Sequence, residues 1–185
     1  CDNCYGVFLG KDYLPDDEDE IFRYNEHNND VNDSNYQNFV KPILNGILND
    51  FNARHKGIDF GAGTGPVISK MLIDKNYNIV QYDPFFHNYP QLLENKYDYI
   101  ACCEVIEHFH KPHKEFALLR KILNPEGKIY CMTNILTAEI DFLTWYYKND
   151  PTHVFFYRTE TFEYIRINFC FKSVKIDGNL IIIAN

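Results

Sequence analysis

Two short stretches of the sequence carry residue types that could do chemistry. The first, DFGAGTG at residues 59–65, places a glycine at every second position. Glycine loses more conformational freedom on folding than other residues, so this pattern indicates that another group approaches the backbone closely. The second, EVIEH at residues 104–108, brings two carboxylates and an imidazole together in the sequence. Such groups can accept a proton or bind a divalent cation.

A strand and a helix are predicted on either side of the glycine segment. KGIDF before it has the pattern of a short strand, and PVISKMLIDKN after it has the pattern of a helix that opens with proline. In an open α/β sheet, ligands bind at the carboxyl ends of the strands, commonly where the first strand turns into its helix. We therefore expect the bare backbone of residues 59–65 and the helix N-terminus to bind a ligand.

The spacing of the glycines separates two classes of ligand. A dinucleotide fingerprint, G-x-G-x-x-G counted from Gly61, requires glycine at position 66, which is proline here. This departure disfavours an NAD-dependent oxidoreductase. The observed D-x-G-x-G-x-G resembles the first motif of the class I S-adenosylmethionine-dependent methyltransferases.

Further segments resemble the same family. NIVQYDP places Asp83 about twenty residues after the glycines, where the family has an acid that binds both ribose hydroxyls. The segment YIACCEVIEHF resembles the family's E-V-L-E-H segment at the end of the fourth strand. The resemblance covers residues 36–185 and implies S-adenosyl-L-methionine as cofactor and S-adenosyl-L-homocysteine as product. It assigns to the cofactor site Asp59, Gly61, Ala62, Gly63, Thr64, Gly65, Asp83, Pro84, Cys103 and Glu104.

One segment departs from the family pattern. Only the 13 residues PFFHNYPQLLENK separate Asp83 from Tyr97, where the family fits a helix and a strand that contact the adenine. This length allows a turn and a short edge strand. No adenine-contacting residue can be assigned from the pattern, although Phe85 and Phe86 could pack on the base.

The periodicity from residue 56 onward predicts a Rossmann-like, doubly wound α/β fold with helices on both faces of a mainly parallel sheet. Strands are expected at KGIDF, NIVQYD, YDYIACC and KIYCMT, and an antiparallel hairpin at the C-terminus turns at Asp177-Gly178. Helices are expected at HKPHKEFALLRKIL, TAEIDFLTWYY and TETFEYIRIN. Upstream, Asp16 or Asp17 could cap a short helix, and a second helix is expected from a capping box at Ser34 and Gln37, kinked or restarted at Pro42.

His108 is the candidate general base, because the resemblance places it at a strand end that points to the transferred methyl group. The alternative is a histidine that only hydrogen-bonds a neighbouring loop. The resemblance also places Glu104 near the methionine part of the cofactor and Asp59 near its amino group.

Residues ahead of the first strand often form a lid in this family. Tyr24 and His27 would share one helical face and line the acceptor pocket with His153 and aromatic residues of WYYKNDPTHVFFY, or that helix could simply pack on the core.

A metal site is the alternative to metal-free transfer. In the methyltransferases that modify the 2′-hydroxyl at small-RNA 3′ ends, an EVIEH-like segment and a later histidine bind a divalent ion. Glu104, Glu107, His108 and His153 would be the corresponding residues. EVIEH-like segments also occur in methyltransferases without metal, so no metal ligand is predicted.

The bulk composition limits the partners. The net charge of −8 weighs against binding nucleic acid by bulk charge. No apolar run is long enough to span a bilayer, and we expect a cytoplasmic protein with a small-molecule substrate. Residues 1–35 are expected to form a lid segment ahead of a methyltransferase domain at 36–185. Its Cys1 and Cys4 are either half of a zinc knuckle whose other ligands lie upstream or two ordinary terminal cysteines.

Taken together, the patterns predict a methyltransferase that acts on a small molecule. Two other functions fit the same residues. One is the metal-dependent RNA 2′-O-methyltransferase, and the other is a binding module that kept the fold and lost catalysis. The intact glycine segment and Asp83 weigh against the second. Acceptor pockets in this family are built from loops whose sequences follow no transferable code, so the acceptor and the oligomeric state cannot be read from the chain.

Overall fold

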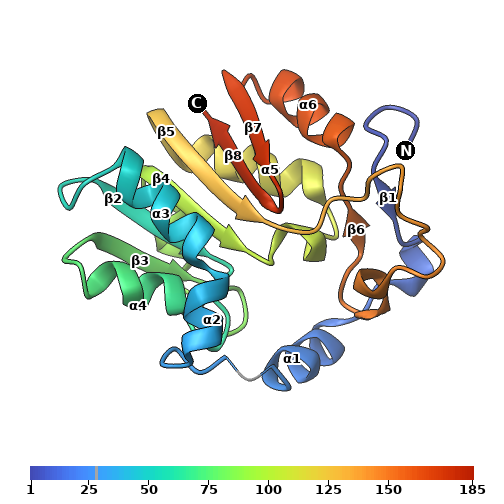
Figure 1. The fold of residues 1–185 in the computed structure, drawn as a ribbon, viewed down its shortest axis with the longest axis horizontal. Coiled ribbons are helices and arrows are strands. Elements are labelled where there is room, and N and C mark those ends of the chain that lie inside the picture. Colours follow the sequence, from blue (N-terminus) through green and yellow to red (C-terminus); the bar gives the residue numbers. More distant parts are fainter. Residues whose placement is uncertain (28) are drawn as a thin grey trace.

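The computed structural model describes residues 1–27 and 29–185, and it contains a six-stranded sheet with the strand order β3-β2-β4-β5-β8-β7 (Figure 1). The first four strands in this order are parallel to one another, and β8 is antiparallel to both β5 and β7. The strands of this sheet are β2 (Lys56–Phe60), β3 (Asn78–Tyr82), β4 (Tyr97–Cys103), β5 (Leu123–Met132), β7 (Ser173–Asp177) and β8 (Leu180–Ala184). The predicted α/β class with a C-terminal antiparallel hairpin is confirmed.

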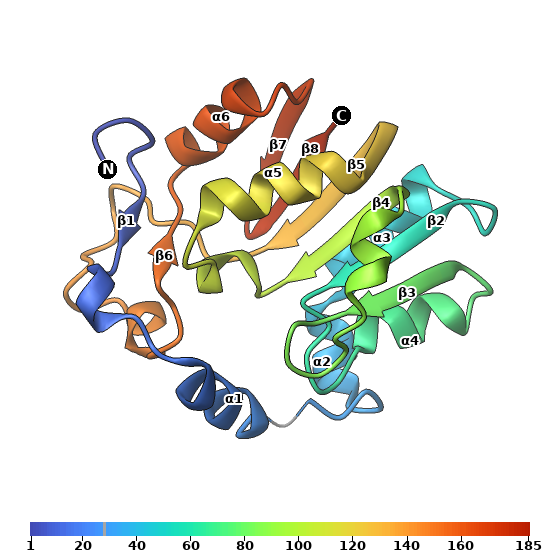
Figure 2. The same ribbon diagram turned by 180° about the vertical axis from the view of Figure 1, so that it is seen from behind.

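Helices cover both faces of this sheet (Figures 1 and 2). On one face, apolar side chains of α3 and α4 pack with Ala101 and Met132 of the central strands. On the other face, α5 and α6 pack against Ile100 and Ile129. Strands buried on both faces must be apolar on both, which explains the near-continuous apolar runs of β4 and β5. The helices are α1 (Asp17–Asn25), α2 (Ser34–Phe39), α3 (Lys41–Asp50), α4 (Val67–Ile73), α5 (Pro112–Ile122) and α6 (Thr159–Asn168).

The register of the parallel strands brings the chemical segments to one edge of the sheet. Phe60 of β2 lies beside Tyr82 of β3, and Asp59 lies beside Ala101 of β4. The residues that follow these three strands are therefore neighbours although they are far apart in the sequence. They are the glycine segment, Asp83 and Glu104.

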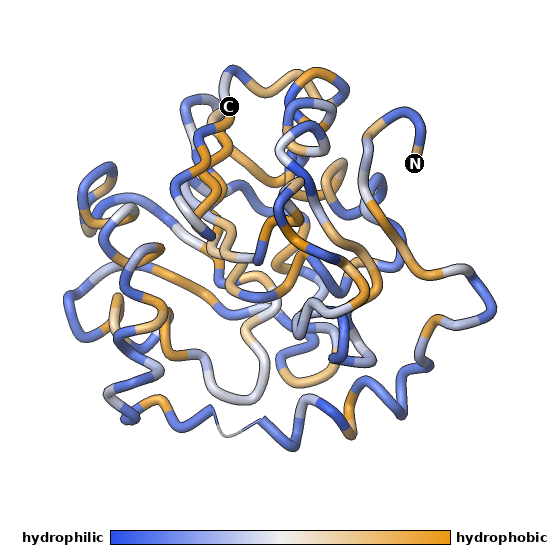
Figure 3. Tube along the Cα trace, turned by 45° about the vertical axis from the view of Figure 1, so that its right-hand side comes forward, coloured by the Kyte–Doolittle hydropathy of each residue, from blue (hydrophilic) through white to orange (hydrophobic). Residues whose placement is uncertain are grey.

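The N-terminal segment folds across the same edge. Strand β1 (Val7–Phe8) pairs antiparallel with β6 (Phe155–Phe156) in a separate two-stranded sheet. Helix α1 follows, capped by the Asp16 side chain, which accepts hydrogen bonds from two backbone N–H groups. Figure 3 shows that this segment is largely hydrophilic, whereas the apolar stretches lie along the central strands. Position 28 of the predicted lid segment lies outside the described residues, and the boundary at residue 35 remains a prediction.

Two local predictions are wrong. Residues 137–147 form turns followed by a 3-10 helix at Tyr146–Asn149, not an α-helix. The Asp141 side chain accepts hydrogen bonds from Leu143 N and Thr144 Oγ1 and so stabilises a turn, and Trp145 packs in a small apolar cluster under this loop. The cap of α2 is Asp33 rather than Ser34. The predicted restart at Pro42 is confirmed, because α3 begins at Lys41.

The short segment after Asp83 forms no β-strand. It contains a 3-10 helix at Pro90–Glu94 and a single bridge between Asp83 and His87. β3 is therefore the edge strand on this side of the sheet. Within the described part of the chain, no helix is both long and apolar enough to cross a membrane.

Candidate functional site

A cavity of about 1280 Å³ opens at the carboxyl ends of β2, β3 and β4. One part of it is lined by the glycine segment, Asp83 and Glu104, and the other part lies between the N-terminal segment and the start of α5. His108 and His153 also line the cavity. Most of the residues that the family resemblance assigns to the cofactor line this cavity, namely Gly61, Ala62, Gly63, Thr64, Asp83, Pro84, Cys103 and Glu104. Asp59 and Gly65 are not part of this lining.

The glycines serve two different purposes. Gly63 has a φ of +59°, and a Cβ added there would meet nothing within 4 Å, so its backbone faces open space in the cavity. A ligand can therefore approach this peptide closely. At Gly65, a Cβ would lie 1.8 Å from the backbone oxygen of Asn29. Gly65 thus lets the chain that follows α1 pack directly on the loop.

Asp83 ties the end of β3 to the glycine loop. Its Oδ2 accepts a hydrogen bond from Gly63 N at 3.0 Å, and its Oδ1 accepts from Phe85 N and Phe86 N. The carboxylate is largely buried but lines the cavity. Its position beside the open Gly63 backbone suits a ligand that offers hydroxyl groups. Phe85 lies in the same lining, with its ring centroid 6.1 Å from that of Tyr24.

Asp59 occupies a buried position beneath the loop. Its Oδ2 accepts hydrogen bonds from Ser69 Oγ at 2.8 Å and from Ser69 N, so it joins β2 to α4. Burial raises the pKa of Asp59 to about 6, despite these hydrogen bonds, which lower it. The predicted contact with a cofactor amino group remains a prediction, and the carboxylate's present role is to fix the loop to the helix.

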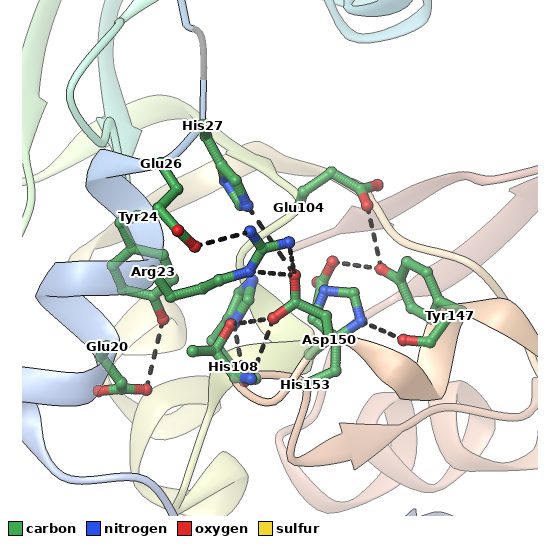
Figure 4. A network of polar contacts seen from close by, with 12 residues as sticks. Glu20, Arg23, Tyr24, Glu26, His27, Glu104, His108, Tyr147, Asp150 and His153 are labelled. Carbon is green, nitrogen blue, oxygen red and sulfur yellow. Dashed lines mark hydrogen bonds and ion pairs between the residues drawn. The ribbon is translucent and has the colours of Figure 1, made fainter.

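Two glutamates and a tyrosine form a buried acidic cluster beside the loop (Figure 4). Tyr147 Oη lies within hydrogen-bonding distance of Glu107 Oε1 and of Glu104 Oε2. Burial raises the pKa of both glutamates, and the charge of Glu104 raises that of Glu107 further. A phenol has one proton and can donate to only one carboxylate, so a hydrogen bond with the second requires a proton on that carboxyl group.

His108 and His153 each bond a backbone carbonyl through the same ring nitrogen, Nδ1. His108 Nδ1 donates to Thr152 O at 2.8 Å, and His153 Nδ1 donates to Tyr147 O at 2.7 Å, because a carbonyl can only accept. Each ring therefore keeps Nε2 as a lone-pair acceptor. Burial and the neighbouring His153 lower the pKa of His108 to about 3, and burial also lowers the pKa of His153. Both imidazoles are neutral at physiological pH.

The arrangement suits a divalent cation. Glu107, His108 and His153 each offer one donor atom, and these atoms lie within 4.8 Å of one another. Across residues 1–27 and 29–185, this is the one such group of three or more potential ligands, so Cys1 and Cys4 belong to none. Among the described residues, Glu104 Oε1 and Glu107 Oε2 are buried and make no hydrogen bond. Neutral imidazoles oriented through Nδ1, with carboxylates nearby, form a donor set typical of Mn²⁺ or Zn²⁺ sites.

Helix α1 covers this part of the cavity with one of its faces (Figure 4). The Tyr24 ring contacts His108 edge-on at 5.3 Å between centroids, and its hydroxyl donates to Glu20 Oε1. His27 Nε2 lies 3.8 Å from Asp150 Oδ2. Tyr24, His27 and His153, predicted to line one pocket, all line this cavity.

Several residues of the site were missed by reasoning from the sequence. Tyr147 belongs to the aromatic segment expected at the acceptor pocket, but its contact with the two glutamates is not predicted, and Arg23, Asp150 and Thr152 have no predicted role. The segment DPT contains the one local signal that could have been used, because aspartate two residues before threonine is typical of a side-chain-stabilised turn. Nothing local indicates that this turn lies against His108.

Comparison with known proteins gives one family. A sequence model of the family described as "Methyltransferase domain" matches residues 32–166, which is more than half of the chain. No curated protein matches the sequence significantly.

Solved structures of similar fold are methyltransferases. A SAM-dependent methyltransferase from Archaeoglobus fulgidus matches with a TM-score of 0.61 and 16% identity, over 80% of this chain and 94% of that one. Phosphoethanolamine N-methyltransferase 2 from Haemonchus contortus, in complex with S-adenosyl-L-methionine, matches with a TM-score of 0.61 and 15% identity, over 92% and 46% of the two chains. Human N-acetylserotonin methyltransferase in complex with SAM matches with a TM-score of 0.58 and 12% identity, over 80% of this chain and 53% of that one. The chain thus spans about half the length of the latter two.

The raised pKa of Asp59 predicts a specific dependence of stability on pH. The Asp59 carboxyl binds its proton more tightly in the folded state than in the unfolded state. The free energy of unfolding therefore falls as the pH rises from the usual pKa of 3.8 to about 6. This loss amounts to about 3 kcal/mol. Asp59→Asn removes the ionisation, and its side-chain oxygen can still accept from Ser69. Urea unfolding at about pH 4 and about pH 7 should show that the wild type loses about 3 kcal/mol more than the variant. Parallel pH profiles would contradict the assignment.

Proposed function

Because the chain belongs to the Methyltransferase domain family, we propose that it transfers the methyl group of S-adenosylmethionine to a hydroxyl oxygen of a small molecule held beside His108. The observation that carries this proposal is the neutral His108 imidazole, which keeps its Nε2 lone pair in a cavity shared with the open glycine loop and Asp83. The loop offers a binding surface for the cofactor, and the imidazole offers an acceptor for the hydroxyl proton.

The cofactor part of the cavity has the groups that a ribonucleoside requires. The open backbone at Gly63 allows close approach, and Asp83 beside it can accept hydrogen bonds from ribose hydroxyls. Phe85 and Tyr82 provide aromatic surface nearby for the base. When bound there, S-adenosylmethionine supplies an electrophilic methyl group and a neutral thioether leaving group.

The protein's own contribution is to position the acceptor and to exclude water. Tyr24 of α1, His27 just after this helix and His153 on the loop that follows Tyr146–Asn149 all line the cavity. Holding two reactants in line can supply a large part of the rate enhancement of a displacement reaction. An enclosed pocket also keeps water away from the acceptor oxygen.

His108 can remove the proton even though its pKa is low. An oxygen that has received a methyl group while still carrying its proton is a strong acid, so a weakly basic neutral imidazole suffices to accept that proton. The hydrogen bond from Nδ1 to Thr152 O fixes the ring so that Nε2 is the accepting atom. Once Nε2 is protonated, the nearby Asp150 carboxylate favours the resulting charge.

A second candidate function is metal-dependent methylation of a hydroxyl group. The convergence of Glu107, His108 and His153, together with the unpaired oxygens of Glu104 and Glu107, favours it. A divalent cation at these residues would supply a Lewis acid that lowers the pKa of a coordinated hydroxyl. The net charge of −8 makes a small molecule a better acceptor for this route than a long RNA.

Cofactor binding separates a protein that uses S-adenosylmethionine from an NAD-dependent oxidoreductase. S-adenosylmethionine and S-adenosylhomocysteine should each raise the melting temperature, and NAD should not. Asp83→Ala should weaken S-adenosylhomocysteine binding by about 10- to 100-fold in calorimetry, because it removes the acceptor for the ribose hydroxyls. Asp74→Ala, which removes an exposed carboxylate paired with Lys70, is the matched control. Stabilisation by NAD alone would overturn the proposal.

The role of His108 predicts a defect in turnover without a defect in cofactor binding. Hydroxyl-bearing small molecules are screened for production of S-adenosylhomocysteine, and the acceptor found is then used for kinetics. His108→Gln should lower kcat by about 10²- to 10⁴-fold and leave S-adenosylhomocysteine affinity unchanged. Wild-type turnover in the variant would exclude His108 as the base. Cofactor binding without turnover of any acceptor would instead favour a binding module.

The metal route predicts binding of a divalent cation in the absence of substrate. Mn²⁺ titrated into the metal-free protein should bind stoichiometrically, as seen by electron paramagnetic resonance. His153→Gln and Glu107→Gln should each weaken binding by at least about tenfold. His113→Gln, on the exposed surface of α5, should have no effect. Equal Mn²⁺ affinity in all variants, or turnover that survives a chelator, would exclude this second function.

A further inference from the structure

A continuous series of polar contacts joins the N-terminal helix to the His108 imidazole (Figure 4). It begins at Arg23 of α1, whose Nε and Nη2 both donate to Asp150 Oδ2, at 3.1 and 2.8 Å. Asp150 is separated from Arg23 by 127 residues, and its side chain is only 14% exposed. Two donors of one guanidinium on one carboxylate make a strong and directional contact.

The second oxygen of the same carboxylate organises the next turn. Asp150 Oδ1 accepts hydrogen bonds from Thr152 N at 3.0 Å and from Thr152 Oγ1 at 2.7 Å. Burial acts to raise the pKa of Asp150, but the hydrogen bonds from Arg23 and Thr152 outweigh it and lower the pKa below its usual value. The carboxylate is therefore ionised throughout the physiological range and uses both oxygens.

The turn fixed in this way holds both histidines of the site. The carbonyl of Thr152, a residue that is 1% exposed, accepts the hydrogen bond from His108 Nδ1. The backbone N–H of His153 donates to Asp150 O. The orientation of the His108 ring thus depends on the Thr152 carbonyl, and the carboxylate that holds Thr152 is the one that pairs with Arg23 of α1.

The same helix touches His108 directly. Tyr24, the residue after Arg23, places its ring edge-on against the imidazole, with an angle of 89° between the ring planes. Helix α1 therefore lies against His108 through the Tyr24 ring, and its Arg23 pairs with the same carboxylate that holds Thr152. Within the described N-terminal segment, two residues form ion pairs with the loop at residues 150–153. They are Arg23 of α1 and His27, which lies just after this helix.

We propose that Arg23 and Asp150 are positioning residues. Their ion pair holds the N-terminal helix over the acceptor pocket, and the other oxygen of Asp150, through Thr152, fixes His108 in the tautomer that presents Nε2 to the cavity. The inference rests on the proposed function only for the use made of Nε2. Both effects are properties of the protein alone, and they can be measured without any acceptor or cofactor.

The test measures the His108 tautomer and the opening of α1 in four variants. Long-range ¹H–¹⁵N correlation spectra of the imidazole report which nitrogen carries the proton, and amide hydrogen exchange reports the opening of α1. Asp150→Ala removes both contacts of the carboxylate, so we expect a mixture of His108 tautomers and about tenfold faster exchange in α1. Asp150→Asn and Arg23→Gln remove the ion pair but leave an acceptor for Thr152. In these two variants α1 should exchange faster by the same factor while His108 keeps its proton on Nδ1.

The control is a similar ion pair elsewhere. Arg166 donates through Nε and Nη2 to Glu163 on α6, so Arg166→Gln removes a comparable contact remote from the cavity. It should change neither readout. The proposal is overturned if Asp150→Ala keeps a single Nδ1–H tautomer, or if Arg23→Gln leaves exchange in α1 unchanged. If Asp150→Ala does not fold, the two conservative variants still decide the coupling to α1. A failure of His108→Gln to reduce turnover would overturn the proposed base and leave these spectra as they are.

Discussion

The parallel register of β2, β3 and β4 is the constraint from which the site follows. Three neighbouring strands that run in the same direction must end at the same edge of the sheet, so the segments that follow them meet there. This places the glycine loop, Asp83 and Glu104 around one cavity although they are spread over more than forty residues of sequence. The cores on the two faces of the sheet hold this edge rigidly, as pre-organised binding of a reactive ligand requires.

The chemistry of the cavity results from burying several ionisable groups together. Burial raises the pKa of Glu104 and Glu107 and lowers the pKa of His108 and His153. Both changes act in the direction of neutral side chains. The two glutamates therefore bind a proton or a cation more readily, and the two imidazoles keep a free lone pair. A hydroxyl group entering this space meets acceptors rather than competing charges.

The N-terminal segment is part of the site and not only a cover for it. Its backbone packs on the loop at Gly65, where no larger residue would fit, and α1 adds Tyr24 and Arg23 to the surroundings of His108. Strand β1 secures the other end of the segment by pairing with β6, which lies next to His153 in the sequence. The segment is thus attached to the rest of the fold at three points, and Phe8, Tyr24 and Asn29, one residue from each, line the cavity.

The sequence by itself determined the α/β class, the C-terminal hairpin, the helix capped by Asp16 and the residues of the glycine loop. These features depend on short-range periodicity, capping and turn chemistry, which are local properties of the chain. The helix predicted at residues 137–147 was wrong because the side chain of Asp141 stabilises a turn and Trp145 is buried in a separate cluster, and tertiary packing outweighs helical propensity there. Only the tertiary structure decided that Asp59 bonds to Ser69, that Tyr147 contacts both glutamates and that Asp150 connects Arg23 to His108. Each of these contacts joins residues that no local pattern relates, because the energy that selects them comes from burial in the folded chain.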